Sequence, residues 1–303
     1  MGLKTPGTAI DQKHLLPRLA AFGAVVLWGV SFVATKAALL QVSPITLVFS
    51  RFALGTAFLI LILKLQRKSM VPPRDALPAL ALMGFLGVVV HQLLQVFGLT
   101  LTTAVRTGWL IGLIPIWTAI LSAIFLHERF GMRKVAGLFV GAVGAFLVIT
   151  RGEFSMRVLA LPRTLGDFLI VASTINWATY TIVSRKMLQR LGSIRTTAAA
   201  MFIGWAMFIP IFLAVSGVQE LSRLTLAGWG YVLFLGVGCS GAGYLLWCVA
   251  LERLEASKVA VWLYLEPLVT VVVAVPVLAE PVGWLMIGGG LLVLAGVFIV
   301  QRK

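Results

Sequence analysis

A histidine and two glutamines lie inside an otherwise apolar stretch, at His91, Gln92 and Gln95. His91 and Gln95 are four residues apart, so they would share one face of a helix. A histidine can change charge near physiological pH, because its unperturbed pKa is about 6.5. His91 could therefore relay a proton or donate a hydrogen bond to the carboxylate of a ligand. A hydrogen bond to a neighbouring helix, with no ligand involved, is the alternative.

Aromatic and amide side chains could supply a second kind of chemistry, the binding of a ring. Trp28 and Trp177 each lie about 11 residues inside an apolar stretch, so a place at a membrane interface, where tryptophan is common, explains them poorly. Rings that pair in offset or edge geometry gain about 0.5–1.5 kcal/mol beyond their buried area. These residues predict a cage for an uncharged aromatic side chain, with plain core packing as the alternative. The candidates are Trp28, Trp109, Asn176, Trp177, Tyr180 and Tyr244.

An acid also lies inside an apolar stretch, where Glu266 precedes Pro267. A carboxylate within a membrane is costly unless it faces the interior of the bundle or water. Glu266 could carry a proton, pair with a cation such as Arg51, or bind the amine of a ligand. Proline removes a backbone donor and loosens a helix, so we predict that Pro115 and Pro267 are kinks on which gating helices bend.

Two similar strings, LHERFG and LAEPVG, follow these prolines at the same distance and contain Glu128 and Glu280. Each glutamate ends one apolar stretch and precedes the next, where a negative charge is favoured by the helix dipole. We predict that Glu128 and Glu280 are structural hinges between helices, and that the repeated strings mark fold geometry more than chemistry.

Composition indicates the elements that must hold these residues. The 303 residues are 60% apolar and 12% charged, with a mean hydropathy of +1.03, whereas soluble proteins carry about 25% charged residues. A helix that crosses a membrane needs about 20 mainly apolar residues. The sequence therefore predicts an all-α integral membrane protein. Its ten transmembrane helices are expected at 17–40, 44–65, 76–98, 103–126, 131–150, 165–186, 196–216, 226–250, 257–279 and 282–301.

The net charge of +15 does not indicate a nucleic-acid partner. Of the 25 lysines and arginines, 18 lie on the termini and on alternate connections, which would share one side of the membrane, and six lie on the other side. Positive residues resist translocation, so this asymmetry predicts that both termini are cytoplasmic. The expected partners are the lipid bilayer and a small molecule.

The second part of the chain repeats the first. Residues 98–149 slide onto 250–301 without a gap and align proline, glutamate and glycine at matched spacing. Further matches, at offsets of 152 and 149, are Gln92 with Tyr244 and Trp28 with Trp177. Because a repeat of five spans is odd, its second copy must insert upside down, which gives two inverted five-helix repeats around a central cavity. The predicted parts are a cytoplasmic leader (1–16), two halves (17–150 and 165–303) and an outer linker (151–164).

The order of short motifs resembles a known family. The chain carries WGVSFVATK in its first predicted helix, Arg51 and Phe52 in its second, and a repeated pattern of alanine, proline and glutamate. It resembles the EamA-type branch of the drug/metabolite transporter superfamily, and within it the bacterial aromatic amino-acid exporters of the YddG type. This resemblance implies a multi-pass carrier in the bacterial inner membrane that exports small metabolites by alternating access.

The expected function is therefore secondary transport of small amphipathic metabolites, most of all aromatic amino acids, by a monomer. An exporter of aromatic cations or drugs is the alternative, and it would depend strongly on Glu266. An intramembrane enzyme is a third reading, since GCSG around Ser240 is similar to a serine protease motif, but no histidine lies downstream to act as its base. The sequence has no ATP-binding loop and no cluster with metal-ligand spacing, so no cofactor and no metal are expected.

Overall fold

The computed structural model describes residues 12–102, 104–150, 162, 164–215, 217–278 and 283–302, so most of the predicted leader and outer linker lies outside the described residues. The described part is helical almost throughout and contains no strand. Its α-helices are α1 (Gln12–Leu39), α2 (Pro44–Leu65), α3 (Leu77–Gly84), α4 (His91–Leu101), α5 (Ala104–Ile111), α6 (Ile114–Phe125), α7 (Met132–Thr150), α9 (Leu165–Leu191), α10 (Ser193–Leu213), α11 (Gly217–Leu221), α12 (Leu226–Leu233), α13 (Tyr244–Arg253), α14 (Ala256–Ala260), α15 (Leu265–Leu278) and α16 (Trp284–Gln301). Shorter segments join some of them: the 3₁₀ turns η1 (Arg74–Ala76) and η4 (Val261–Tyr264) and the π-helical segments η2 (Phe85–Val90) and η3 (Phe234–Gly243).

Local sequence signals fix where two long helices begin. α2 starts after Ser43, whose side chain accepts a hydrogen bond from the Thr46 amide, and Pro44 occupies its first turn. α9 starts with a capping box, in which Thr164 and Asp167 each accept a hydrogen bond from the backbone amide of the other. Both devices satisfy amide groups that a helix N-terminus leaves without intrahelical partners.

Seven helical stretches in the described part are long and apolar enough to cross a membrane, and they match seven of the ten predicted spans. The other three predicted spans, at 103–126, 165–186 and 257–279, have a physical reason to fall outside this set. The first is interrupted between α5 and α6, and the third is divided by η4. The second lies within α9, which buries the polar side chains of Asp167, Asn176 and other residues. The count of ten spans therefore remains a prediction.

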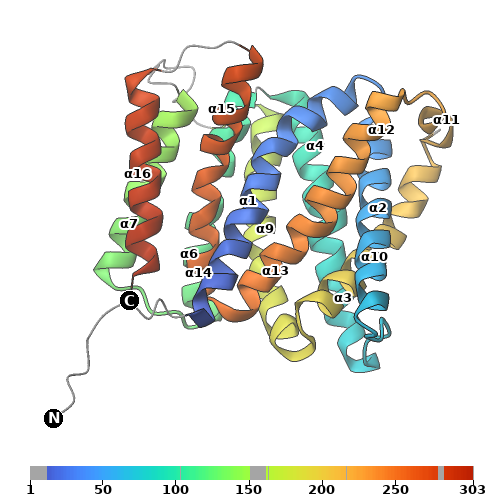
Figure 1. The fold of residues 1–303 in the computed structure, drawn as a ribbon, viewed down its shortest axis with the longest axis horizontal. Helices are drawn as coiled ribbons and strands as arrows, with labels where there is room; N and C mark the ends of the chain where they lie inside the picture. The colour runs from blue at the N-terminus through green and yellow to red at the C-terminus, as the bar shows by residue number, and fades with distance from the viewer. Residues whose placement is uncertain are drawn as a thin grey trace.

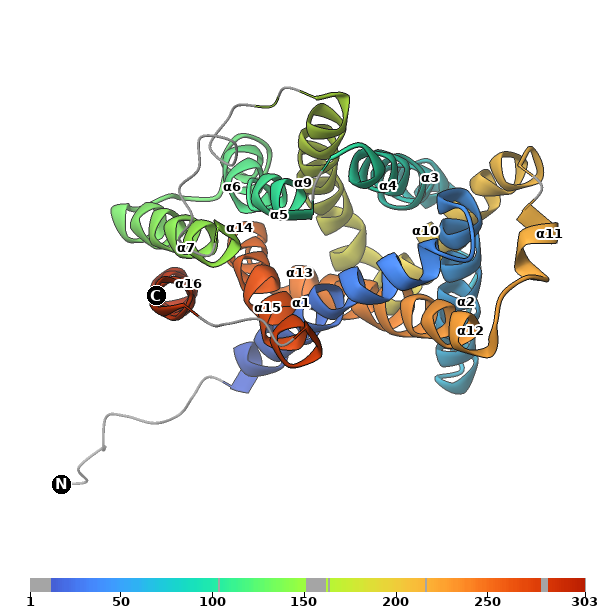
Figure 2. The same cartoon turned by 90° about the horizontal axis from the view of Figure 1, so that it is seen from above.

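The helices form three groups across the molecule (Figures 1 and 2). α7 and α16 lie together at one edge, α2, α10 and α12 lie at the other, and α1, α9 and α13 cross between them. Arg18 near the start of α1 donates a hydrogen bond to the carbonyl of Gln301 at the end of α16. We call the side that holds these two helix ends the Gln301 face. The opposite side, where α1 connects to α2, is the Ser43 face.

Glycines bring helix backbones together at two kinds of contact. A Cβ atom on Gly144 of α7 would lie 2.6 Å from the carbonyl oxygen of Gly289 in α16, and one on Gly137 would lie 3.0 Å from that of Gly296. The residue numbers rise along one helix as they fall along the other, so α7 and α16 are antiparallel. Adding the repeat offset of 152 to Gly137 and Gly144 gives Gly289 and Gly296, so each of these two contacts is the counterpart of the other. Small residues allow this close approach inside membranes.

The second kind of contact joins the other helix group. A Cβ atom on Gly84 would lie 2.7 Å from the amide nitrogen of Gly204, and one on Gly55 would lie 3.0 Å from the carbonyl oxygen of Gly236. Gly84 and Gly236 differ by 152 residues, and Gly55 and Gly204 by 149, so these contacts are also counterparts of one another. Contacts that are reciprocal in this way are expected where two like units meet about a two-fold axis.

We expect Gly144→Ala to destabilise the pair of α7 and α16 by about 1–3 kcal/mol, the usual cost of forcing a methyl group into a packed contact. The new Cβ would lie 2.5 Å from the amide nitrogen of Val293, which is backbone and cannot move aside alone. Gly288→Ala is the matched control, because a Cβ there has no neighbour within 4 Å. Thermal unfolding in detergent measures both; an equal response of the two variants would contradict this packing.

Irregular backbone is concentrated near the middle of the molecule. The π-helical segments η2 and η3 end directly before His91 and Tyr244, in corresponding parts of the two repeats. π-helical turns inside α-helices are frequent at functional sites. Pro115 and Pro267 lie in the first turns of α6 and α15, directly after the interruptions described above. Each proline therefore starts a new helix after a break rather than bending a continuous one, and a gating role for either remains a prediction.

Candidate functional site

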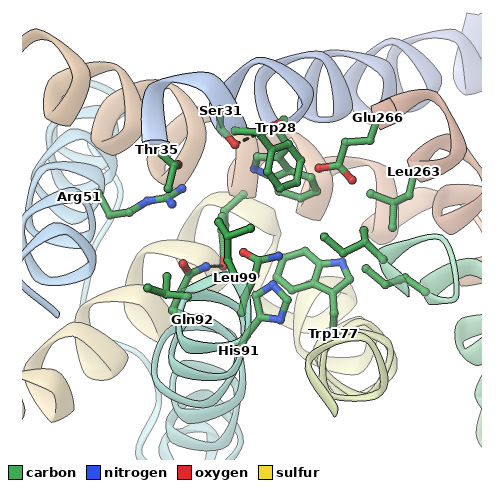
Figure 3. A pocket seen from close by; sticks show the side chains of 16 residues that line it. Trp28, Ser31, Thr35, Arg51, His91, Gln92, Leu99, Trp177, Leu263 and Glu266 are labelled. Atoms are coloured by element: carbon green, nitrogen blue, oxygen red, sulfur yellow. Dashed lines mark hydrogen bonds between the residues drawn. The ribbon is translucent and has the colours of Figure 1, made fainter. Parts of the chain in front are cut away.

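A cavity lies between α1, α2, α4, α9, α13 and α15, bounded also by the last residue of α5, the first residue of α6 and η4 (Figure 3). It holds about 710 Å³ of empty space when its opening is included. Along α1 and α4 its lining runs from Trp28 and His91 to Thr35 and Leu99, close to the helix ends at the Ser43 face. The cavity therefore reaches from the middle of the molecule toward the Ser43 face. Its lining residues are Trp28, Ser31, Phe32, Thr35, Arg51, His91, Gln92, Gln95, Val96, Leu99, Ile111, Ile114, Trp177, Tyr244, Leu263 and Glu266.

Aromatic rings close the cavity on the side of the Gln301 face. Trp177 is the centre of this aromatic cluster: its ring lies 5.3 Å from that of Trp28, 5.0 Å from Tyr180, 5.3 Å from Tyr244 and 6.1 Å from Trp247. Trp28 and Trp177, which match in the repeat, meet edge to face at 85°. The two tryptophans and Tyr244 line the cavity, so they offer ring surfaces to a solute as well as to one another.

Polar side chains on α4 are held by hydrogen bonds to neighbouring helices. The Nδ1 atom of His91 lies 3.3 Å from the Ser173 carbonyl oxygen, which favours a hydrogen on Nδ1 and leaves Nε2 as an acceptor in the neutral ring. Gln92 donates to the Tyr244 hydroxyl at 3.2 Å, and that hydroxyl donates to the carbonyl of Gly87. Gln92 and Tyr244 are counterparts in the repeat, so this contact joins equivalent positions of the two halves.

Two charged side chains complete the lining. Arg51 and Glu266 are only 8% and 7% exposed, yet no ion pair joins them within 4.0 Å. The sequence had raised such a pair as one possibility. The Arg51 Nε atom donates a hydrogen bond to the Ser240 hydroxyl at 2.9 Å. Arg51 was not among the predicted binding residues, although a charge inside an apolar span is the signal that could have included it.

The structure brings most of the predicted binding residues together. Those that line the cavity are Trp28, His91, Gln92, Gln95, Trp177, Tyr244 and Glu266. Tyr180 lies behind Trp177 and lines a smaller pocket, and Asn176 donates a hydrogen bond to the Leu86 carbonyl at the start of η2. The Trp109 side chain and Glu280 lie outside the described residues.

Glu128 forms the centre of a second polar cluster, at the Gln301 face. Its carboxylate accepts hydrogen bonds from the backbone amides of Ala256 and Ser257, at 2.6 and 3.3 Å, and from the Ser257 hydroxyl. Arg185 of α9 lies 2.7 Å away and Lys134 of α7 lies 3.6 Å away. Glu128 therefore caps the N-terminus of α14, whereas the sequence predicted a role beside the next helix in the chain. Glu128 thereby links the connection that precedes α7 with two other helices, α9 and α14.

Glu255 adds an acid-sensitive contact to this Glu128 cluster. Partial burial acts to raise the pKa of Glu255, but the hydrogen bond and charge of Lys134, together with Lys258, outweigh it and hold the pKa below its ordinary 4.5. A lowered pKa stabilises the fold above the ordinary value, and this stabilisation is lost as the pH falls through the lowered value. We expect the melting temperature of the wild type to fall toward that of Glu255→Gln as the pH drops below 4.5. A constant difference across this range would contradict the assignment.

Comparison with known proteins places this arrangement among transporters. The model of the EamA-like transporter family matches twice, at residues 16–150 and 164–302. The chain is 29% identical over 289 residues to the uncharacterized transporter YyaM of Bacillus subtilis, covering 94% of this chain and 93% of that protein. It is 32% identical over 279 residues to an uncharacterized transporter of Archaeoglobus fulgidus, with 92% and 96% covered.

Two further comparisons concern substrate and fold. A relative from Streptantibioticus cattleyicolor, named as a probable terminal-alkyne amino-acid exporter, is 28% identical over 232 residues, or 77% of this chain and 75% of its own. One solved crystal structure covers 96% of both chains with a TM-score of 0.78 at 19% identity, so the two chains share an overall fold. With the seven apolar helices, these relatives indicate a multi-pass membrane protein.

Proposed function

Because this chain belongs to the EamA-like transporter family, we propose that it is a secondary carrier that exports aromatic amino acids and similar amphipathic metabolites by alternating access. Transport of small molecules follows from the family. The aromatic substrate is our proposal, and one observation carries it: the paired rings of Trp28 and Trp177 form the inner end of a cavity that also holds polar and charged side chains. Small-molecule sites commonly combine apolar or aromatic walls with a few placed polar groups.

The proposal includes ten membrane helices in two inverted halves, at 17–150 and 165–303. The reciprocal glycine contacts and the hydrogen bond between the counterparts Gln92 and Tyr244 support this organisation. Halves related by a two-fold axis in the membrane plane would enclose a site near the midplane that either face can reach. One chain supplies every wall of the cavity described here, so we expect a monomer to be sufficient.

The mechanism that we propose alternates two closures. In the described conformation the cavity reaches toward the Ser43 face, while the aromatic cluster and the Glu128 cluster hold the Gln301 face together. We place the Gln301 face in the cytoplasm of a bacterial inner membrane, and the excess of basic residues on that face supports this orientation. Export would then require the Glu128 cluster to open, admit a solute from the cytoplasm, and close again behind it.

Flux through purified protein in liposomes tests this function. We expect tryptophan to exchange at least about ten times faster than leucine, since ring contacts worth about 0.5–1.5 kcal/mol each are available only to the aromatic solute. A pH gradient applied in the same assay shows whether protons are coupled to transport. Equal rates for the two amino acids would contradict the preference for aromatic substrates. If neither amino acid moved faster than in empty liposomes, amino-acid export itself would be contradicted.

A further inference from the structure

We propose that Arg51 and Glu266 make the cavity selective for dipolar solutes, with the anionic group bound at Arg51 and the cationic group at Glu266. This inference rests on the proposed function and names the charge pattern of its substrate. It also treats Glu266 as a binding group rather than as a partner of Arg51. Neither family membership nor the aromatic cluster requires this pattern.

Arg51 has donors to spare. A guanidinium carries five N–H donors, and within the described part of the chain Arg51 makes one hydrogen bond, from Nε to the hydroxyl of Ser240. This bond holds the stem of the side chain and leaves the two terminal nitrogens directed into the cavity (Figure 3). A planar guanidinium with both terminal nitrogens free matches the two oxygens of a carboxylate.

Glu266 is the opposite case. Glu266 is only 7% exposed. Its carboxylate lines the cavity and has no hydrogen bond or ion pair with the residues that the structure describes. Figure 3 shows it on the side of the cavity opposite Arg51, with Trp28 between the two. A buried carboxylate without a partner is costly. The ammonium group of a solute would supply the missing partner.

Each charge also rejects solutes that lack the complementary group. A monocation at Glu266 would leave the guanidinium of Arg51 buried and uncompensated, and a monoanion at Arg51 would do the same to Glu266. Specificity commonly comes from such unpaired buried charges in the wrong complex. A solute with both charges compensates both walls at once, whereas Arg51 and Glu266 form no ion pair with each other in the described conformation.

The spacing of the two charges on the solute is a separate question. An α-amino acid carries its ammonium and carboxylate groups on one carbon. The additional residue of a dipeptide places the two groups roughly 3.5 Å farther apart. Because Arg51 and Glu266 lie on opposite sides of the cavity, a solute with widely spaced charges spans more of the gap between them. A dipeptide would therefore need the two walls to approach less than an α-amino acid would. Dipolar chemistry is common to the two, and the test includes both.

The test compares four indole solutes in liposomes: tryptophan and glycyl-tryptophan, which carry both charges, tryptamine, which is a cation, and indole-3-propionate, which is an anion. We expect the wild type to move one or both dipolar solutes at least roughly 10-fold faster than either singly charged solute, the size expected for one charge-assisted contact. Arg51→Gln should lower the flux of the dipolar solutes relative to tryptamine by a similar factor. Glu266→Gln should lower it relative to indole-3-propionate.

Flux ratios within one variant do not depend on how much protein has folded, so a poorly folding variant still answers the question. Arg195→Gln is the control for loss of a positive charge, because Arg195 is outside the cavity and contacts the Val71 carbonyl. Unchanged ratios in both variants, or a wild type that prefers a singly charged solute, would overturn the dipolar assignment while leaving transport intact. If the wild type moves none of the four solutes, the proposed function fails as well.

Discussion

Glu128→Gln is expected to slow transport of aromatic amino acids by at least about 10-fold, because it opens the Gln301 face that must close during each cycle. Removing one partner from a buried ion pair costs about 3–5 kcal/mol, and each 1.4 kcal/mol changes an equilibrium about tenfold. The side chain of Glu128 is only 4% exposed, and glutamine would turn an amide NH₂ toward Arg185 or Lys134 in place of an anionic oxygen. The closed state would then lose much of its population.

Glu255→Gln is the matched control for Glu128→Gln. Glu255 lies in the same cluster and pairs with Lys134 at 2.7 Å, but its side chain is 41% exposed. Exposed ion pairs contribute about 0–1 kcal/mol, so this variant should keep most of its flux at neutral pH. Flux in liposomes with equal amounts of monodisperse protein measures both. Equal losses in the two variants, or full activity in Glu128→Gln, would show that the Glu128 cluster is not a gate.

Trp177→Ala is expected to lower the ratio of tryptophan flux to leucine flux by at least about 10-fold, since the lost ring contacts are worth about 0.5–1.5 kcal/mol each. Trp177 contacts the rings of Trp28, Tyr244 and His91 around the inner end of the cavity. Leucine has no aromatic ring that could pair with the ring of Trp177, so the flux of leucine should fall less. Trp177→Phe, which keeps a ring, should retain part of the preference.

A tryptophan outside the cavity provides the control for Trp177. Trp205 packs against Phe49, with ring centroids 5.5 Å apart, and does not line the cavity. Trp205→Ala should therefore change the two fluxes by the same factor, whatever its effect on folding. If Trp177→Ala also lowered both fluxes equally, Trp177 would be a packing residue and the aromatic cage would be wrong.

Much of the architecture was predictable because a membrane imposes simple requirements on a sequence. The predicted span at 44–65 coincides with α2, and the predicted family is confirmed. His91, Trp28 and Trp177 could be predicted to face a cavity because polar groups and central tryptophans are poorly explained by lipid contact. The repeat offsets indicated in advance which positions would be equivalent.

The parts that sequence reasoning missed depend on contacts between distant segments. Glu128 was assigned to its own helix connection, but it caps α14, which begins 128 residues later. Nothing local in the sequence specifies that partner. Arg51 was known to lie within a span, yet whether it paired with Glu266 or faced the cavity depended on how α2 and α15 are placed. Interruptions such as η4 could not be predicted from hydropathy either, because a 3₁₀ turn of apolar residues has the same composition as an apolar α-helix.

The most direct test of alternating access is the side from which the cavity can be labelled. Ser31→Cys, with Cys239 and Cys248 replaced by alanine, places one thiol on the cavity wall in oriented membranes. We expect a membrane-impermeant maleimide to reach it from the Ser43 face in the wild-type background, and from the Gln301 face once Glu128→Gln is added. Labelling from neither face, or from the Gln301 face with the Glu128 cluster intact, would contradict the account.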